Sequence, residues 1–179
     1  MMREDIDYIL LDREKLAERV SELGKQLAAD YAGEVPVMVC ILRGSVVFYA
    51  DLIRAMDLPV QLEFMRASSY GSATVSSGKV HVVGELDNVI KDRHVVLVED
   101  IIDSGRTIAF LKQDMLGKGV KSLKVCSLLD KPSRRVADVE PDYCGFTIPD
   151  EFVVGYGLDY DQKYRNLPDV CVLKPEVYM

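Results

Sequence analysis

The chain has 179 residues, of which 49% are hydrophobic and 28% charged, and this composition predicts one globular domain rather than a disordered or fibrous chain. Its 22 basic and 29 acidic side chains give a formal net charge of −7. That balance argues against a nucleic-acid-binding surface but leaves room for a small anion in a local site.

The longest apolar run, 35–42, is much shorter than the roughly 20 residues of a membrane helix. The acidic start is not that of a signal or transit peptide. The four cysteines lie far apart and show neither CxxC nor Cys/His spacing, which predicts reduced thiols rather than zinc ligands at Cys40, Cys126, Cys144 and Cys171. We therefore expect a cytoplasmic protein without membrane or nucleic-acid partners.

The first part of the chain alternates between helix and strand patterns. Apolar residues at helical spacing predict a helix over 12–33. A continuous apolar run at 36–42 predicts a buried parallel strand. After a Gly-Ser break, 46–56 predicts a second helix and 58–65 a second strand.

The middle of the chain predicts a loop followed by another strand–helix–strand unit. Small, uncharged residues at 68–78 are typical of a mobile loop, and 79–86 alternates like a strand that returns as a hairpin. A second apolar strand at 95–98 leads to a helix ending near Met115, and 120–129 predicts the next strand.

The segment after Lys131 is short, rich in proline and aromatic residues, and ends in a strand-like run at 170–173. It resembles a cap on the sheet rather than another helix–strand repeat. Strands alternating with helices predict an α/β fold with a mainly parallel sheet. Because the sequence shows neither a repeat nor a linker, we expect a single domain over 1–179.

Residues 95–107, Val-Val-Leu-Val-Glu-Asp-Ile-Ile-Asp-Ser-Gly-Arg-Thr, are the most informative stretch. The strand delivers its last residues to the carboxyl edge of the sheet, where open α/β folds bind ligands. The turn 104–107 then enters a helix, whose free backbone N–H groups and dipole favour phosphate. Taken singly, such a turn also fits an ordinary helix start with a serine cap.

Three acids, Glu99, Asp100 and Asp103, precede this turn and would repel a bare phosphate. They suit a ligand that also offers hydroxyl groups, or a divalent cation that bridges the two. A sugar phosphate with Mg²⁺ offers both. The absence of GxxxxGK[ST] and GxGxxG argues against a nucleoside triphosphatase and a dinucleotide dehydrogenase.

This stretch resembles the phosphoribosyl-pyrophosphate (PRPP) signature of the type I phosphoribosyltransferases, and its Glu-Asp-Ile-Ile-Asp form resembles the hypoxanthine-guanine branch. Further matches from Leu42-Arg43-Gly44 to Arg165 cover nearly the whole chain. The resemblance implies the type I phosphoribosyltransferase fold, a mainly parallel central sheet flanked by helices. A base-binding hood at about 131–165 would lie over the carboxyl edge, with a flexible lid hairpin at about 68–79.

The resemblance also implies roles for the acids and the turn. Glu99 and Asp100 would bind the ribose hydroxyls near Mg²⁺, as ionised carboxylates accept strongly. Asp103 would be the catalytic proton acceptor at purine N7, and Ile101 would contact the purine. The 5′-phosphate would lie against the residues of the phosphate loop: Asp103, Ser104, Gly105, Arg106 and Thr107.

Two further segments are implied to contact the pyrophosphate and to close the site. Arg43 and Gly44, after the first strand, would bind pyrophosphate together with Arg165, and family members often have a cis peptide before the residue at position 43. Taken alone, Arg-Gly after a strand also fits a simple turn. Ser69 and Tyr70 match the Ser-Tyr pair of the family's lid, which would exclude water from an oxocarbenium-like transition state.

The resemblance places the purine in the last third of the chain. Lys131 would donate to the 6-oxo group, Phe152 would stack on the base, and the backbone of Val153 would read its pyrimidine edge. Asp159 would bond the base edge or a metal-bound water, so that the implied metal set is Glu99, Asp100 and Asp159. As isolated residues, Lys131 also fits a surface cation and Phe152 a core residue.

The implied activity is purine salvage: Mg²⁺-dependent transfer of 5-phosphoribosyl from PRPP to N9 of hypoxanthine, and of guanine as well, giving IMP or GMP and pyrophosphate. The implied assembly is a homodimer or homotetramer. Ser104, Gly157 and Arg43 stand where threonine, alanine and lysine are frequent, and the preference among hypoxanthine, guanine and xanthine stays open. The alternatives are an RNA-binding regulator of the same fold, such as the pyrimidine attenuation proteins, and an adenine or orotate transferase.

Overall fold

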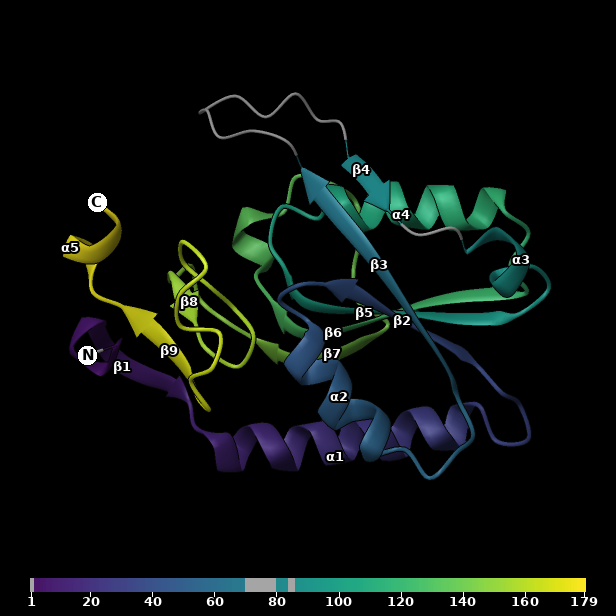
Figure 1. Ribbon diagram of the computed structural model, residues 1–179, viewed down its shortest axis with the longest axis horizontal. Helices are drawn as coiled ribbons and strands as arrows, with labels where there is room; N and C mark the ends of the chain where they lie inside the picture. Colours follow the sequence, from purple (N-terminus) through teal and green to yellow (C-terminus); the bar gives the residue numbers. More distant parts are fainter. Residues whose placement is uncertain (1, 70–79, 84–85) are drawn as a thin grey trace.

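The computed structural model, which describes residues 2–69, 80–83 and 86–179, is built around a six-stranded sheet of order β4-β3-β2-β5-β6-β7 (Figure 1). Five of these strands are parallel: β3 (Gln61–Ser69), β2 (Val37–Leu42), β5 (His94–Ile102), β6 (Ser122–Asp130) and β7 (Tyr143–Thr147). The edge strand β4 (Val80–Val83) pairs antiparallel with β3. The α/β fold class with a parallel central sheet is thereby confirmed.

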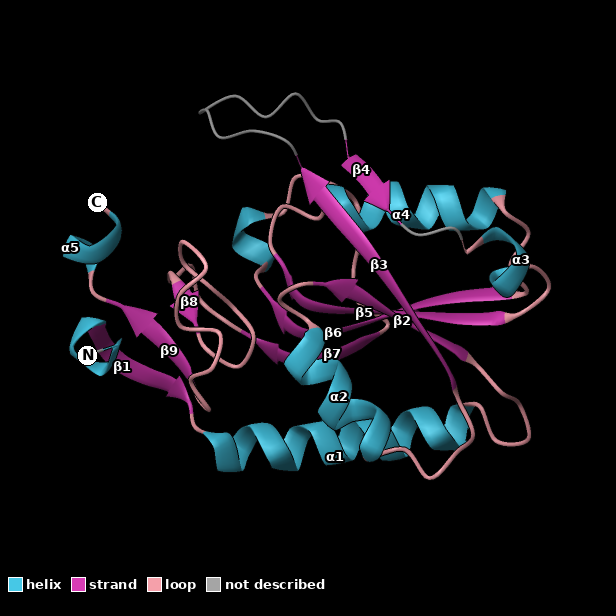
Figure 2. Cartoon of the chain, viewed as in Figure 1, coloured by secondary structure: helices cyan, strands magenta, loops and turns pink. Residues whose placement is uncertain are grey.

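Helices cover both faces of this sheet (Figure 2). The helices α1 (Arg13–Asp30) and α2 (Val46–Arg54) lie on one face, and α3 (Asp87–Ile90) and α4 (Arg106–Gly117) on the other. The middle strands are consequently buried on both sides, which explains the unbroken apolar runs of β2 and β5.

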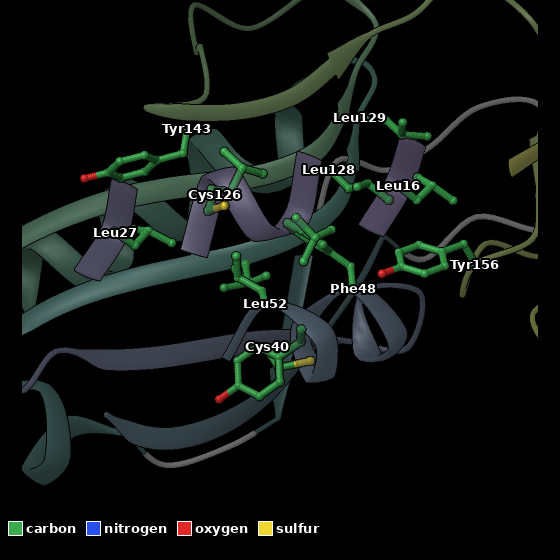
Figure 3. Packing of buried hydrophobic residues seen from close by; sticks show 14 of the residues in the cluster. Leu16, Leu27, Cys40, Phe48, Leu52, Cys126, Leu128, Leu129, Tyr143 and Tyr156 are labelled. Atoms are coloured by element: carbon green, nitrogen blue, oxygen red, sulfur yellow. The ribbon is translucent and has the colours of Figure 1, made fainter. Parts of the chain in front are cut away.

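The core therefore has two halves, one on each side of the sheet. Met38 and Cys40 of β2 face α1 and α2, whereas Val37, Val39 and Ile41 face α4. Figure 3 shows the first half, in which leucines of α1 and the apolar side of α2 pack against β2 and β6. Burial raises the pKa of the Cys40 thiol to about 11, and all four cysteines are free.

Helix α1 begins where the sequence pattern predicts. The Asp12 carboxylate accepts a hydrogen bond from the backbone N–H of Lys15 at 2.8 Å, which caps the helix. Its residues at 3.6-residue spacing are buried: Leu16, Val20, Leu23 and Leu27. Among the described residues, no helix has the length and apolar content that a membrane span requires.

A second, smaller sheet of order β1-β9-β8 lies beside the carboxyl edge of the central sheet (Figure 1). It consists of β1 (Ile6–Leu11), β9 (Val170–Leu173) and β8 (Val153–Val154), all antiparallel. The strand pattern at 170–173 is confirmed as β9. Three short helices complete the described elements: η1 (Met2–Asp5), η2 (Pro132–Arg134) and α5 (Pro175–Tyr178).

Several boundaries differ from the sequence expectation. The strand β3 begins at Gln61, not at 58, because Pro59 has no backbone N–H and the first ladder bond runs from Gln61 N to Pro36 O at 3.0 Å. It continues to Ser69, so the expected loop 68–78 starts inside a strand. The return strand of the hairpin is confirmed as β4, while most of the expected lid, including Tyr70, lies outside the described residues.

Three strands were not predicted: β1, β7 and the two-residue β8. In β1 the burial does not alternate, and its pairing with β9 contains two register shifts, so a period-two signal is missing. Strand β7, inside the expected hood segment, adds a parallel strand to the central sheet. Its Gly145 weakens the strand signal.

Candidate functional site

The candidate site lies at the point of the central sheet from which successive strands are added in opposite directions. The chain moves from β2 to β3 on one side and from β5 to β6 and β7 on the other, so β2 and β5 flank the switch point. Ligands of open α/β sheets bind in the crevice at this point. The pairing of β2 with β5 ends at Val98, while β5 continues along β6 to Ile102. Residues 99–102 thus lie beyond the last residue pair with β2, at the crevice.

The phosphate loop forms the turn between β5 and α4. Gly105 precedes the first helical residue with φ of +79°, and an added Cβ would lie 2.6 Å from Val139 Cγ2 and 2.7 Å from Arg135 Cδ. Both the backbone conformation and the packing therefore require glycine. A cavity of about 90 Å³ at this turn is lined by Glu99, Ile101, Ile102, Asp103, Ser104, Gly105, Thr107 and Ile108. Arg106 is exposed at the start of α4.

Two adjacent acids occupy the end of β5. Burial raises the pKa of Glu99 well above its usual value, and the neighbouring Asp100 raises it further. Burial also raises the pKa of Asp100 to about 6, although the N–H of Ile101, at 2.8 Å from Oδ1, and the nearby Arg165 oppose the shift. Glu99 Oε2 is buried and has no hydrogen-bond partner among the described residues. A pair of partly buried acids with an unsatisfied oxygen is suited to hydrogen-bond donors or a cation from a ligand.

Three chain segments meet in close contact beside these acids. A Cβ on Gly44, in the loop after β2, would overlap the Asp100 carboxylate, and a Cβ on Gly157 would overlap the carbonyl oxygen of Gly44. Gly157 also has φ of +104°. The peptide bond between Leu42 and Arg43 is cis, as the resemblance implies. The alanine that is frequent at position 157 therefore does not fit this backbone.

The segment after β8 brings Arg165 and Asp159 to the same place. Arg165 donates through Nη1 to the carbonyl oxygen of Gly157 at 2.8 Å, and its Nη2 pairs with Asp159 Oδ1 at 2.8 Å. Arg43, on the other side of the crevice, contacts this segment by a hydrogen bond that it donates to Gln162. The structure thus brings Arg43, Gly44 and Arg165 together near Asp100. Gln162 was missed, because no sequence pattern distinguishes it.

Lys131 lies on the other side of the phosphate loop. It is only 5% exposed, so the alternative of a surface cation does not hold. Its Nζ donates to the carbonyl oxygen of Glu151 at 2.8 Å and lies 3.5 Å from Asp150 Oδ1. Its backbone N–H bonds to Ile102 O at 2.9 Å, which fixes it at the end of β6 next to β5.

Asp103 and Lys131 are connected by a chain of charged groups. Asp103 Oδ1 lies 3.4 Å from Arg134 Nε, and Arg134 Nη1 lies 3.5 Å from the Asp150 carboxylate that also faces Lys131. Asp103 Oδ1 is buried and accepts no hydrogen bond from the described residues. Arg134 and Asp150 were missed by the sequence analysis, since both look like solvated loop charges.

Phe152 belongs to an aromatic cluster at the start of β8. Tyr178 stacks on its ring with centroids 4.6 Å apart at 17°, and Tyr160 packs edge-on at 5.5 Å. Phe152 nevertheless remains 36% exposed, whereas the following Val153 is buried. The aromatic neighbours fix the ring and leave part of it accessible to a planar ligand. Ser69, expected in the lid, forms the end of β3.

Comparison with known proteins identifies relatives over the full length. Residues 9–161 match the family model described as the phosphoribosyl transferase domain. The chain is 48% identical over 178 residues to the hypoxanthine-guanine phosphoribosyltransferase of Streptococcus thermophilus (strain CNRZ 1066), covering 99% of each. It is 46% identical over 178 residues to the enzyme of the same name from Bacillus subtilis (strain 168), again covering 99% of each.

Solved structures show the same likeness. A hypoxanthine phosphoribosyltransferase from Staphylococcus aureus superimposes with a TM-score of 0.95 at 45% identity, covering 99% of this chain and 97% of that one. The hypoxanthine phosphoribosyltransferase from Trypanosoma cruzi, in a ternary complex with substrates, gives a TM-score of 0.91 at 40% identity over 98% of this chain and 100% of that one.

Proposed function

The chain belongs to the phosphoribosyltransferase family, on the branch of the hypoxanthine-guanine enzymes, and from this we infer a purine salvage enzyme that transfers phosphoribosyl from PRPP to a purine base. The observation that carries this function is the arrangement at the switch point. There the phosphate loop and the acids Glu99 and Asp100 lie between an arginine pair on one side and a buried lysine on the other.

The test is incubation of the protein with PRPP and Mg²⁺ and each of hypoxanthine, guanine, xanthine and adenine, with nucleotide formation followed by absorbance. We expect turnover of hypoxanthine and guanine and none of adenine. The same series ranks hypoxanthine, guanine and xanthine against one another. If PRPP binds and no base is converted, the enzyme function is wrong. A gel shift with RNA at low salt would then favour the regulator.

We propose Asp103 as the catalytic base. As N9 of the base forms its bond to C1′ of the ribose, the bond from C1′ to pyrophosphate breaks and its electron pair leaves with the pyrophosphate. The proton on N7 then passes to the Asp103 carboxylate, which neutralises the charge gained by the purine. Asp103 Oδ1 accepts no hydrogen bond from the described residues, which supports this role. Arg134, at 3.4 Å, orients that oxygen.

We propose Lys131 as the donor to the 6-oxo group. An ammonium has three N–H bonds, and two of them are directed at Glu151 O and Asp150. The third is available for the purine oxygen. Because adenine carries an amino group at this position, a fixed donor here selects against it. Phe152 supplies the stacking surface and the backbone of Val153 the contact to the pyrimidine edge, with Ile101 beside the base.

Replacement of Lys131 by methionine is expected to raise KM for hypoxanthine and guanine about 10- to 100-fold, because a hydrogen bond to a charged group contributes roughly 1.5–3 kcal/mol. The KM for PRPP is expected to stay within about twofold of its original value. Steady-state kinetics with each substrate varied in turn measures both. Lys91→Met, at an exposed lysine, is the control. An unchanged KM for both bases would remove Lys131 from the purine site.

We propose that Mg²⁺ binds with PRPP at Glu99 and Asp100, with Asp159 reaching it through a water. Glu99 Oε2 is buried and has no hydrogen-bond partner among the described residues, so it is a suitable oxygen ligand for the ion. The described residues contain no cluster of three or more His, Cys, Asp or Glu side chains that could hold a metal. Mg²⁺ commonly takes one or two carboxylates and completes its shell with substrate oxygens and water, so the residues fit the ion. When bound, it neutralises charge on the leaving pyrophosphate. Loss of turnover on EDTA addition, restored by Mg²⁺, tests this.

We propose a homodimer or homotetramer and a cytoplasmic location. Leu62 and Phe64 on β3 are both more than 40% exposed, and the Phe64 ring packs edge-on against Tyr49 of α2 at 5.5 Å, an apolar surface suited to a second copy of the chain. Free cysteines suit a reducing compartment. Sedimentation equilibrium of the protein and of Phe64→Asp tests the assembly, and cell fractionation tests the location.

A further inference from the structure

The two arginines proposed for pyrophosphate come from opposite sides of the crevice. Arg43 is an exposed side chain in the loop after β2. Arg165 lies in the segment after β8, where Gly157 O and Asp159 fix its guanidinium and leave the side chain 26% exposed. Long cationic side chains have many rotamers, so a site that needs both must restrict them.

Gln162 joins these two side chains. Its Oε1 accepts a hydrogen bond from Arg43 Nη1 at 2.9 Å and lies 3.4 Å from Arg165 Nη2. Its own backbone is fixed, because Gln162 N donates to Asp159 Oδ2 at 2.8 Å while the other oxygen of Asp159 pairs with Arg165. The amide oxygen is therefore a single acceptor held between two guanidinium groups.

The chemical type of this acceptor matters. An amide oxygen is neutral, so it orients both guanidinium groups and adds no negative charge beyond that of Asp159, which already pairs with Arg165. A carboxylate at the same place would cancel part of that charge and compete with the anion. An apolar side chain would leave Arg43 without its partner in this segment.

We propose that Gln162 is a positioning residue for the pyrophosphate group. It holds Arg43 and Arg165 at a spacing that lets both contact one pyrophosphate. When pyrophosphate binds, the two arginines donate to it the hydrogen bonds that they otherwise donate to Gln162. This inference rests on the proposed function, in which both arginines bind pyrophosphate. Gln162 contacts the ligand only through the arginines, so it affects binding of PRPP and pyrophosphate and leaves recognition of the base unchanged.

The experiment uses two substitutions and a matched control. Gln162→Met keeps the length of the side chain and removes the acceptor, whereas Gln162→Glu keeps the acceptor and adds a charge. Asp161→Asn is the control, because Asp161 is adjacent, exposed, also at positive φ, and paired with Lys163 rather than with either arginine. For each protein, titration calorimetry with Mg²⁺ and pyrophosphate gives Kd, and kinetics give KM for PRPP and for hypoxanthine.

We expect Kd for pyrophosphate and KM for PRPP to rise about tenfold in Gln162→Met, the effect of losing one charge-assisted hydrogen bond, and by a similar factor in Gln162→Glu, where the added carboxylate competes with the anion for both arginines. The KM for hypoxanthine and both values in Asp161→Asn are expected to stay within about twofold. High salt is expected to reduce the defect of Gln162→Glu and not that of Gln162→Met, because only the former is an added charge. A purely structural role would not produce this difference.

Pyrophosphate binding by Gln162→Met equal to that of the unchanged protein overturns the proposal, as does an equal rise in KM for both substrates. Failure of the proposed function is a separate result. In that case the unchanged protein converts no base, while the pyrophosphate titrations still decide the role of Gln162.

Discussion

Replacement of Asp103 by asparagine is expected to lower kcat about 10²- to 10⁴-fold, the range of a positioned general base. The amide has the same shape and can still face Arg134, but it cannot take a proton. Asp103 is well placed for this role, because its Oδ1 is buried in the structure without a hydrogen-bond partner among the described residues. The backbone of the phosphate loop is unaltered by the change, so Kd for PRPP is expected to stay within about threefold.

Single-turnover kinetics with hypoxanthine and guanine measures the chemical step, and calorimetric titration measures PRPP binding. Asp138→Asn, at an exposed acid close by in the chain, is the matched control and is expected to react normally. A kcat for Asp103→Asn within about fivefold of the original would show that another group accepts the proton.

The second large effect is expected on stability, from Arg135. Its side chain is 14% exposed, and it pairs with Asp130, itself 13% exposed. Nε also donates to Asp103 O at 3.0 Å and Nη2 to Ile102 O at 3.3 Å, while Nη1 donates to Val139 O. Arg135→Leu leaves a buried carboxylate and several carbonyl groups without their donor, so the free energy of unfolding is expected to fall by about 3–5 kcal/mol.

Urea denaturation followed by circular dichroism measures this loss. The matched control is Arg134→Leu, because the adjacent arginine is 55% exposed and the side chains of its partners Asp103 and Asp150 are 43% and 54% exposed; its expected cost is below about 1 kcal/mol. Adding Asp130→Asn to Arg135→Leu is expected to restore part of the stability, because the unpaired charge is removed. Equal losses in Arg135→Leu and Arg134→Leu would contradict a structural role for the buried pair.

The parts of the site that could be predicted are those whose residues are contiguous in the chain. Residues 95–107 combine an apolar run, acids and a Ser-Gly turn, and each of these has a local physical meaning. They form the end of β5, the phosphate loop and the start of α4, as expected. Lys131 and Arg165 could be named only from the resemblance, since single charged residues carry no local signal.

The parts that were missed depend on contacts between distant segments. Arg134, Asp150 and Gln162 acquire their positions only when the segment 131–165 lies against the loops after β2 and β5. Tyr178 reaches Phe152 because β8 pairs with β9, which leads into α5. Neither periodicity nor composition reports such proximity.

The small sheet β1-β9-β8 has a consequence for the order in which the two halves of the site can form on a ribosome. Strand β1 has no partner in that sheet until β9 is made, since Ile6 pairs with Leu173, and β8 with its adjacent Phe152 also waits for β9. The β2, β5 and α4 elements that carry the phosphate loop have partners close by in the chain. We therefore expect that during vectorial synthesis the part of the site around the phosphate loop assembles first, and that the part around Phe152 is completed only after β9 has emerged.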